Sequence, residues 1–238
     1  MFVLQKLILA HLIADFVLQF EELYQLKLRS TVGHVVHASC HTVMSLLLLW
    51  PYLTRPSVWL FVGIISVVHF FQDLWKYARM GRRHTFCLLF VWDQLVHLAC
   101  LTPVLLLPFS RDVLGFPGAP RLDLLYRDPT MTLLAIAFIT LTFAASYLLH
   151  AFRINYVPRS RPDHFITSFE MAHGFVERSL IAGVCAFATS PVPLILLPAV
   201  GLLRAPFPRL HNLTDFALSL ALSLTLGLLF RMWLPTLR

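Results

Sequence analysis

Residues 57–76 read SVWLFVGIISVVHFFQDLWK, and this stretch decides the fold. An α-helix of about 20 residues spans roughly 30 Å, which is the thickness of the hydrocarbon core of a membrane. Its last turns nevertheless carry His69, Asp73 and Lys76. The stretch therefore predicts a transmembrane helix that brings ionisable side chains into the bilayer.

Apolar runs recur along the whole chain. Hydrophobic residues make up 58% of the 238 residues and charged residues 13%, whereas soluble domains are about half apolar and about a quarter charged. Besides 57–76, the runs lie near 2–20, 33–54, 86–109, 130–152, 165–187, 191–204 and 213–234. The short run 191–204 contains two early prolines and either crosses the membrane or re-enters it. We predict an all-α, polytopic transmembrane helix bundle of about eight spans.

The runs predict one integral membrane domain over residues 1–238. Residues 1–110 form a four-helix half, 111–128 a connector outside the cytoplasm, and 129–238 the C-terminal helices. With the N-terminus outside, inner loops hold 11 of the 19 basic residues and the outer side holds 7. Because cytoplasmic loops are enriched in Lys and Arg, this orientation is favoured, and the acid-free segment 76–83 is predicted to be cytoplasmic.

The distribution of charge argues against a nucleic-acid-binding protein, and the spacing of the cysteines argues against a site built on a C-x-x-C pair. The net charge of +7 arises largely from short loops and chain ends, so it indicates orientation in a membrane rather than nucleic-acid binding. The four cysteines form no C-x-x-C pair and lie in apolar runs, which is typical of buried thiols.

Histidine and aspartate recur at helical spacing in the first four runs. His11 and Asp15 are four residues apart, as are His69 and Asp73, and this spacing places two side chains on one helix face. The second run carries His34, His37 and His41, and the fourth carries Asp93, Gln94 and His97. The two HxxxD pairs are 58 residues apart, which suggests a parallel repeat of two helix hairpins.

In the predicted topology these groups lie at similar depth, near the cytoplasmic ends of four helices. We expect Asp15, Asp73 and Asp93 to meet at least two of the histidines in one cavity. The physical reason is the cost of a lone carboxylate in lipid, roughly 2.5–3.5 kcal/mol. Interhelical hydrogen bonds that only hold the bundle together are the alternative interpretation.

Neutral imidazole and carboxylate are ligands that Zn²⁺, Mn²⁺ or Fe²⁺ accept. The candidate metal ligands are His11, Asp15, His37, His41, His69 and Asp73, and the candidate catalytic residues are Asp93 and His97. A single ion cannot bind them all, so some would orient the imidazoles of others. A path for protons or a divalent cation is the alternative for the same residues.

A second cluster lies in the sixth run and consists of Glu170, His173, Glu177 and Arg178. Arg178 is expected to pair with one of the glutamates. The cluster either fixes helix packing through a buried ion pair or completes the first site from the C-terminal half.

These motifs resemble a family of small bacterial membrane proteins catalogued as domain of unknown function 3307. The resembling elements are His11-x3-Asp15-Phe16 with Gln19, Lys27, His37-x3-His41, His69-Phe70-x2-Asp73-x2-Lys76, Asp93-Gln94-x2-His97 and Gly174-Phe175-Val176-Glu177-Arg178-x-Leu180-Ile181. The resemblance implies a polytopic protein of the bacterial cytoplasmic (inner) membrane and supplies no substrate. The HxxxD pattern is also similar to that of predicted membrane-bound metal-dependent hydrolases. Leu203-Arg204 departs from the Lys-bearing stretch that the family tends to have.

The leading hypothesis from the sequence is metal-dependent hydrolysis of a membrane-associated substrate. The metal ion would lower the pKa of bound water, and an Asp or His outside the coordination shell would act as general base. The expected partners are membrane lipids, including an amphiphilic or anionic lipid substrate drawn by the basic inner loops, and no nucleic acid. Two alternatives are a proton or divalent-cation transporter and a non-catalytic accessory subunit that binds other membrane proteins.

Overall fold

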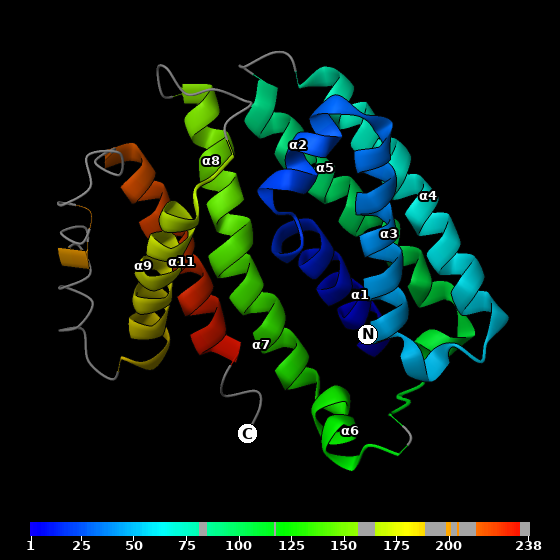
Figure 1. Ribbon diagram of the computed structural model, residues 1–238. Coiled ribbons are helices and arrows are strands. Elements are labelled where there is room, and N and C mark those ends of the chain that lie inside the picture. The colour runs from blue at the N-terminus through cyan, green and yellow to red at the C-terminus, as the bar shows by residue number, and fades with distance from the viewer. Residues whose placement is uncertain are drawn as a thin grey trace. The chain divides into compact units, whose positions relative to one another are not determined.

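The computed structural model describes residues 1–80, 85–116, 118–156, 165–188, 199–200, 204 and 213–233 (Figure 1). These residues form helices and loops and no strand, so the predicted all-α fold is confirmed. The chain divides into two compact units, of which unit 1 holds residues 1–139 and 154–165 and unit 2 holds residues 140–153 and 166–238. Most of the predicted run 191–204 lies outside the described residues.

The helices that are long and apolar enough to cross a membrane are Pro56–Arg79, Phe86–Leu106, Pro129–Tyr156 and Leu213–Met232. A fifth is added if Phe2–Val17 and Glu21–Arg29, which are bent by 84°, form one broken span. The predicted number of eight spans is therefore not confirmed, because the described residues provide four or five. The helices Thr31–Leu48 and Ser168–Phe187 fall short because histidines dilute the first and charged residues interrupt the second.

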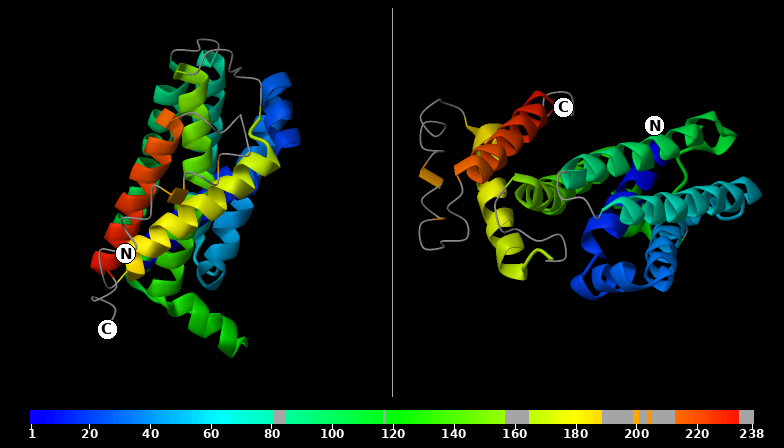
Figure 2. Two further views of the ribbon diagram at one scale, coloured as in Figure 1. Left: turned by 90° about the vertical axis from the view of Figure 1, so that its left-hand side faces the viewer. Right: turned by 90° about the horizontal axis from the view of Figure 1, so that it is seen from above.

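Four helices of unit 1 close a ring. They are α1 (Phe2–Leu12), α3 (Thr31–Leu48), α4 (Pro56–Arg79) and α5 (Phe86–Leu101). Both α1 and α4 pack against α3 and α5, and α7 (Pro129–Ile139) also packs against α1 (Figure 1). Figure 2 shows the same helices from two further sides. Side chains from all four helices therefore face a common interior.

One end of this ring is filled by an apolar core. Its buried members are Val3, Leu7, Leu49, Tyr52, Val58, Phe61, Val62, Leu101, Val104 and Phe109. The hydroxyl group of Tyr52 in this core is hydrogen-bonded. It donates to the Asp112 carbonyl at 2.7 Å and accepts from the Leu114 amide at 3.1 Å. Burial raises the pKa of Tyr52, which keeps its proton available for the first of these bonds.

The other end of the ring is closed by a bend in the chain. After α1 the chain forms one turn of π-helix, η1 (Ile13–Val17), and then turns into α2 (Glu21–Arg29), which packs across α3. Gly33 of α3 allows this contact, because a Cβ atom at position 33 would lie 2.4 Å from the Lys27 amide nitrogen. The α2 segment therefore sits directly on α3.

We expect Gly33→Ala to destabilise the protein by about 1–3 kcal/mol, because a methyl group there overlaps backbone that cannot rotate away. Gly63→Ala in α4 is the matched control, since no atom of the described residues lies within 4 Å of its Cβ position. The control should be neutral or more stable by about 0.5–1 kcal/mol, as expected for alanine in a helix. Thermal unfolding in detergent micelles measures both, and equal stability of the two variants would contradict the close α2–α3 contact.

Unit 2 is built around two long helices. Helix α9 (Ser168–Phe187) packs along α11 (Leu213–Trp233), and a Cβ atom at Gly227 would lie 2.7 Å from the Ala182 carbonyl oxygen. A second turn of π-helix, η6 (Thr140–Ala144), leads into α8 (Ala145–Tyr156) and packs against α9. Gly227 thus permits α9 and α11 to cross closely.

Candidate metal centre

Asp15 is the centre of a histidine cluster inside the unit 1 ring. Its Oδ1 lies 2.7 Å from His41 Nε2 and 3.1 Å from His37 Nε2. Its Oδ2 accepts a hydrogen bond from Gln94 Nε2 at 2.8 Å. Three further imidazoles lie with a ring nitrogen near this carboxylate, namely His11 at 3.6 Å, His69 at 3.8 Å and His97 at 3.9 Å.

The local backbone helps to place this carboxylate. Asp15 lies in the π-helical turn η1, just before the 84° bend into α2. A π-turn contains an extra residue relative to the α-helix, so it changes the direction in which the following side chains point, and such turns are frequent at functional sites. The HxxxD spacing assumes a regular α-helix, but the helix is locally widened at Asp15.

The imidazole rings of the cluster are stacked. The His69 ring centroid lies 3.7 Å from that of His41 and 4.1 Å from that of His97, with interplanar angles of 35° and 32°. Charged imidazolium rings would repel one another strongly at such separations in a buried place. The arrangement therefore favours neutral rings, which is the form that binds metal ions.

Several polar atoms of the cluster are buried and have no hydrogen-bond partner among the residues that the structure describes. They are His37 Nδ1, His69 Nε2, His97 Nδ1 and Nε2, and Asp93 Oδ1. Buried polar atoms are nearly always bonded, so unsatisfied nitrogens and a carboxylate oxygen in one place indicate that something binds there. Both kinds of atom are metal ligands, and a divalent cation therefore fits the residues present.

Two overlapping groups of side chains have the composition of a metal site. Donor atoms of His11, Asp15, His41 and His69 all lie within 4.8 Å of one another, and so do those of Asp15, Asp93 and His97. All of these residues are buried. Asp15 belongs to both groups.

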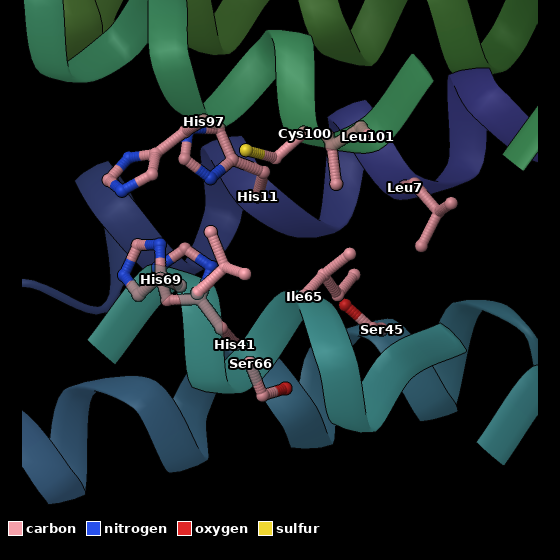
Figure 3. Close-up of a pocket in the computed structure, with 11 residues that line it drawn as sticks. Leu7, His11, His41, Ser45, Ile65, Ser66, His69, His97, Cys100 and Leu101 are labelled. Carbon is pink, nitrogen blue, oxygen red and sulfur yellow. The ribbon is translucent and has the colours of Figure 1, made fainter. Parts of the chain in front are cut away.

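A small cavity of about 20 Å³ adjoins the first group. In Figure 3 the imidazoles of His11, His41, His69 and His97 lie together at one end of it, and Leu7 and Leu101 lie toward the other. A space of this size holds about one water molecule. The candidate ligand atoms therefore border a space that also has an apolar wall.

Asp73 lies in an adjoining ionic group. Its Oδ2 is 2.8 Å from His34 Nδ1 and 3.4 Å from Lys27 Nζ, and its Oδ1 is 3.2 Å from Lys76 Nζ. Lys76 Nζ also donates to Asp93 Oδ2 at 2.7 Å. The predicted single layer of His and Asp is thus two adjoining groups, and Asp93 contacts both.

The sequence of this region matches a known family. Residues 3–112 match the DUF3307 family, which is described as a protein of unknown function. The DUF3307 region contains α1 to α5 and every residue of the two groups around Asp15 and Asp73. The resemblance is confirmed for this part of the chain, and the Gly174–Ile181 element lies beyond the match. No curated protein and no solved structure matches the chain.

The structure places the predicted site residues of the DUF3307 region as follows. The five predicted histidines gather around Asp15, and they are His11, His37, His41, His69 and His97. Asp93 lies beside His97, whose Nε2 is 3.7 Å from Asp93 Oδ1. Asp73, predicted as a metal ligand, contacts lysines and His34 instead of the imidazoles around Asp15. Gln94 was not chosen from the sequence, although it bonds Asp15 and approaches His11 Nε2 at 3.3 Å.

The second predicted cluster forms its own network in unit 2. Arg178 was expected to pair with a glutamate, but its guanidinium donates to the carbonyls of Leu141 and Thr142 at 2.6 and 2.7 Å and also bonds the Ser146 hydroxyl. The π-helical turn η6 leaves these carbonyls outside the ordinary helix pattern, and a buried cation satisfies them. Glu177 pairs instead with Arg204 at 2.6 Å.

The remaining members of that cluster have structural partners. Glu170 and Thr167 form a capping box at the start of α9, and Glu170 Oε1 lies 3.1 Å from Arg153. His173 Nδ1 lies 4.0 Å from Glu177 Oε2. These contacts favour the interpretation of this cluster as a device for helix packing.

Proposed function

We propose that this protein is a metal-dependent hydrolase that acts on a membrane-associated substrate. The observation that carries the proposal is the buried group of His11, Asp15, His41 and His69, whose donor atoms lie within 4.8 Å of one another. The ligand types suit zinc, manganese or iron. His37, which contacts Asp15 Oδ1, would orient that carboxylate for the ion.

Side chains next to this group supply the remaining requirements of hydrolysis. When bound, a divalent ion activates water for attack at neutral pH and polarises the bond to be cleaved. His97 lies beside Asp93, and neither ring nitrogen of His97 has a hydrogen-bond partner in the described part of the chain. His97 is therefore free to accept a proton from water as a general base, with Asp93 stabilising the resulting imidazolium.

Two observations favour hydrolysis over the alternatives. A transporter needs polar groups through the whole bundle, whereas buried hydrophobic side chains dominate the end of the ring away from α2, and the buried Lys6 ammonium beside them is held by Tyr126 and Thr132. An accessory subunit needs its buried polar groups satisfied by each other, whereas the histidine cluster contains unpaired nitrogens. An enclosed site at one end of the ring suits an amphiphile whose head group enters from the nearer membrane surface.

Metal-dependent turnover tests the proposal. The purified protein in vesicles should hydrolyse an acylated or phosphorylated lipid in the presence of Zn²⁺ or Mn²⁺, and chelation should stop it. His69→Gln should lower the rate by about a hundredfold or more, because a ligand is lost. His173→Gln in α9 is the matched control. Metal-driven flux into sealed vesicles without turnover would instead support transport and contradict the hydrolase.

We also propose a bacterial inner-membrane location with the N-terminus outside, which places the end of α4 in the cytoplasm. Arg79→Cys, in a background that lacks the four native cysteines, should escape an impermeant maleimide in intact cells and react after permeabilisation. Efficient reaction in intact cells would reverse the orientation and place the Asp15 cluster toward the outer surface.

A further inference from the structure

The two oxygens of Asp15 serve different neighbours. Oδ1 faces His41 and His37, and His69 Nε2 also approaches it at 3.8 Å. Oδ2 accepts a hydrogen bond from Gln94, and His11 Nε2 and His97 Nδ1 lie 3.6 and 3.9 Å from it. A carboxylate that has imidazole nitrogens near both of its oxygens can bridge two metal ions.

Two buried residues near Asp15 Oδ2, namely Asp93 and His97, carry atoms that can bind a metal ion. Asp93 is 0% exposed and His97 4% exposed. Within the described ranges, Asp93 Oδ1 and both nitrogens of His97 have no hydrogen-bond partner. Asp93 Oδ2 is already held by Lys76, so its free oxygen is the one directed toward His97. One ligand atom each of Asp15, Asp93 and His97 lies within 4.8 Å of the other two, so these three residues can share one ion.

The charges of the region indicate what else binds. The histidine cluster around Asp15 and the adjoining ionic group around Asp73 together contain three carboxylates and two ammonium groups. The carboxylates are Asp15, Asp73 and Asp93, and the ammonium groups are Lys27 and Lys76. With neutral imidazoles their formal sum is one negative charge. Two divalent ions would leave three positive charges in a buried site, which is costly unless an anion binds with them. A phosphoryl group supplies such charge and can bridge two ions.

We propose that the DUF3307 region holds a second divalent ion at Asp15, Asp93 and His97, and that its substrate carries a phosphoryl group. This inference rests on the proposed function, because Asp15 is shared with the first ion. Asp93 and His97 then act as ligands and no longer as the general-base pair. Hydrolysis adds water across the ester: the water oxygen bonds to phosphorus, the phosphorus–oxygen ester bond breaks, and a water proton passes to the leaving alcohol.

Titration of the purified full chain with Mn²⁺, followed by paramagnetic resonance and by metal analysis, tests this without a substrate. We expect two equivalents and a spectrum of two exchange-coupled ions. His97→Gln, which breaks no hydrogen bond within the described residues, should bind one equivalent and show an isolated ion. Asp93→Asn should do the same, and His173→Gln should behave as the wild type.

The anion is tested in two arms. Inorganic phosphate added to the micellar protein, or phosphatidic acid in place of phosphatidylcholine in nanodiscs, should tighten the second equivalent by about tenfold or more. An effect of the lipid beyond that of inorganic phosphate identifies a head group as the source. An effect of inorganic phosphate alone identifies a soluble phosphate.

The outcomes separate this inference from the proposed function. One uncoupled equivalent in the wild type, with phosphate present, would overturn the second ion and leave the hydrolase. Two equivalents retained in His97→Gln would overturn this location for the second ion. Failure of both phosphate arms would overturn the phosphoryl substrate. No bound Mn²⁺ or Zn²⁺ at all would overturn the proposed function itself.

Discussion

Asp15→Asn is expected to weaken Zn²⁺ binding by at least about a hundredfold, since loss of a side chain that only orients a metal ligand already costs about ten- to a hundredfold. The amide keeps the size of the side chain but removes the anionic ligand that both groups share. It also replaces one carboxylate oxygen by an NH2 group, so only one acceptor oxygen remains for His41 and His37, which both contact Oδ1. Calorimetric titration of the purified variant measures the affinity.

A matched variant controls for loss of any carboxylate. Asp123→Asn in α6 (Pro120–Arg127) changes a side chain that bonds Arg127 and the Phe116 amide, outside the histidine cluster. It should bind metal as the wild type does, and helical circular dichroism should show that both variants fold. Wild-type affinity in Asp15→Asn would show that Asp15 is not a ligand.

Arg204→Met is expected to destabilise the protein by about 3–5 kcal/mol, because it strands a buried carboxylate. Glu177 is 0% exposed, and both its oxygens accept hydrogen bonds from Arg204, at 2.6 and 2.7 Å. The variant leaves Glu177 with the hydroxyl of Ser219, at 2.5 Å. Asp215 would keep its bonds to Arg153. Thermal unfolding in micelles measures the loss.

A second substitution distinguishes a stranded charge from lost packing. In the double variant Arg204→Met, Glu177→Met the buried charge is gone, so most of the stability should return. Arg127→Met removes an exposed partner of Asp123 and should cost less than about 1 kcal/mol. A double variant that is no more stable than Arg204→Met would contradict the explanation.

The HxxxD spacing predicted which helices meet, but it did not predict that their ionisable side chains form two groups, one around Asp15 and one around Asp73. Residues four apart share a face yet differ by about 6 Å along the helix axis. His69 therefore reaches the Asp15 cluster, whereas Asp73, one turn further on, reaches Lys27 and Lys76. The single site expected from the sequence is resolved into two for this reason.

Other features depended on contacts that no local pattern carries. Lys27 reaches Asp73 only because the chain bends by 84° and Gly33 lets α2 settle on α3. Gln94 is adjacent to Asp93 in the sequence. A polar amide next to an aspartate within an apolar run was the sequence feature that could have indicated its part in the site. Arg204 lies 27 residues from Glu177, so nothing local indicated their pairing.

The metal content of the protein tests the central claim most directly. The full chain should be purified without chelators, exposed to Zn²⁺ or Mn²⁺, freed of excess metal and subjected to elemental analysis. The account predicts at least about one equivalent per chain in the wild type and a large loss in a variant that carries both His41→Gln and His69→Gln. Less than about a tenth of an equivalent of any transition metal in the wild type, before and after this exposure, would contradict a metal centre at Asp15.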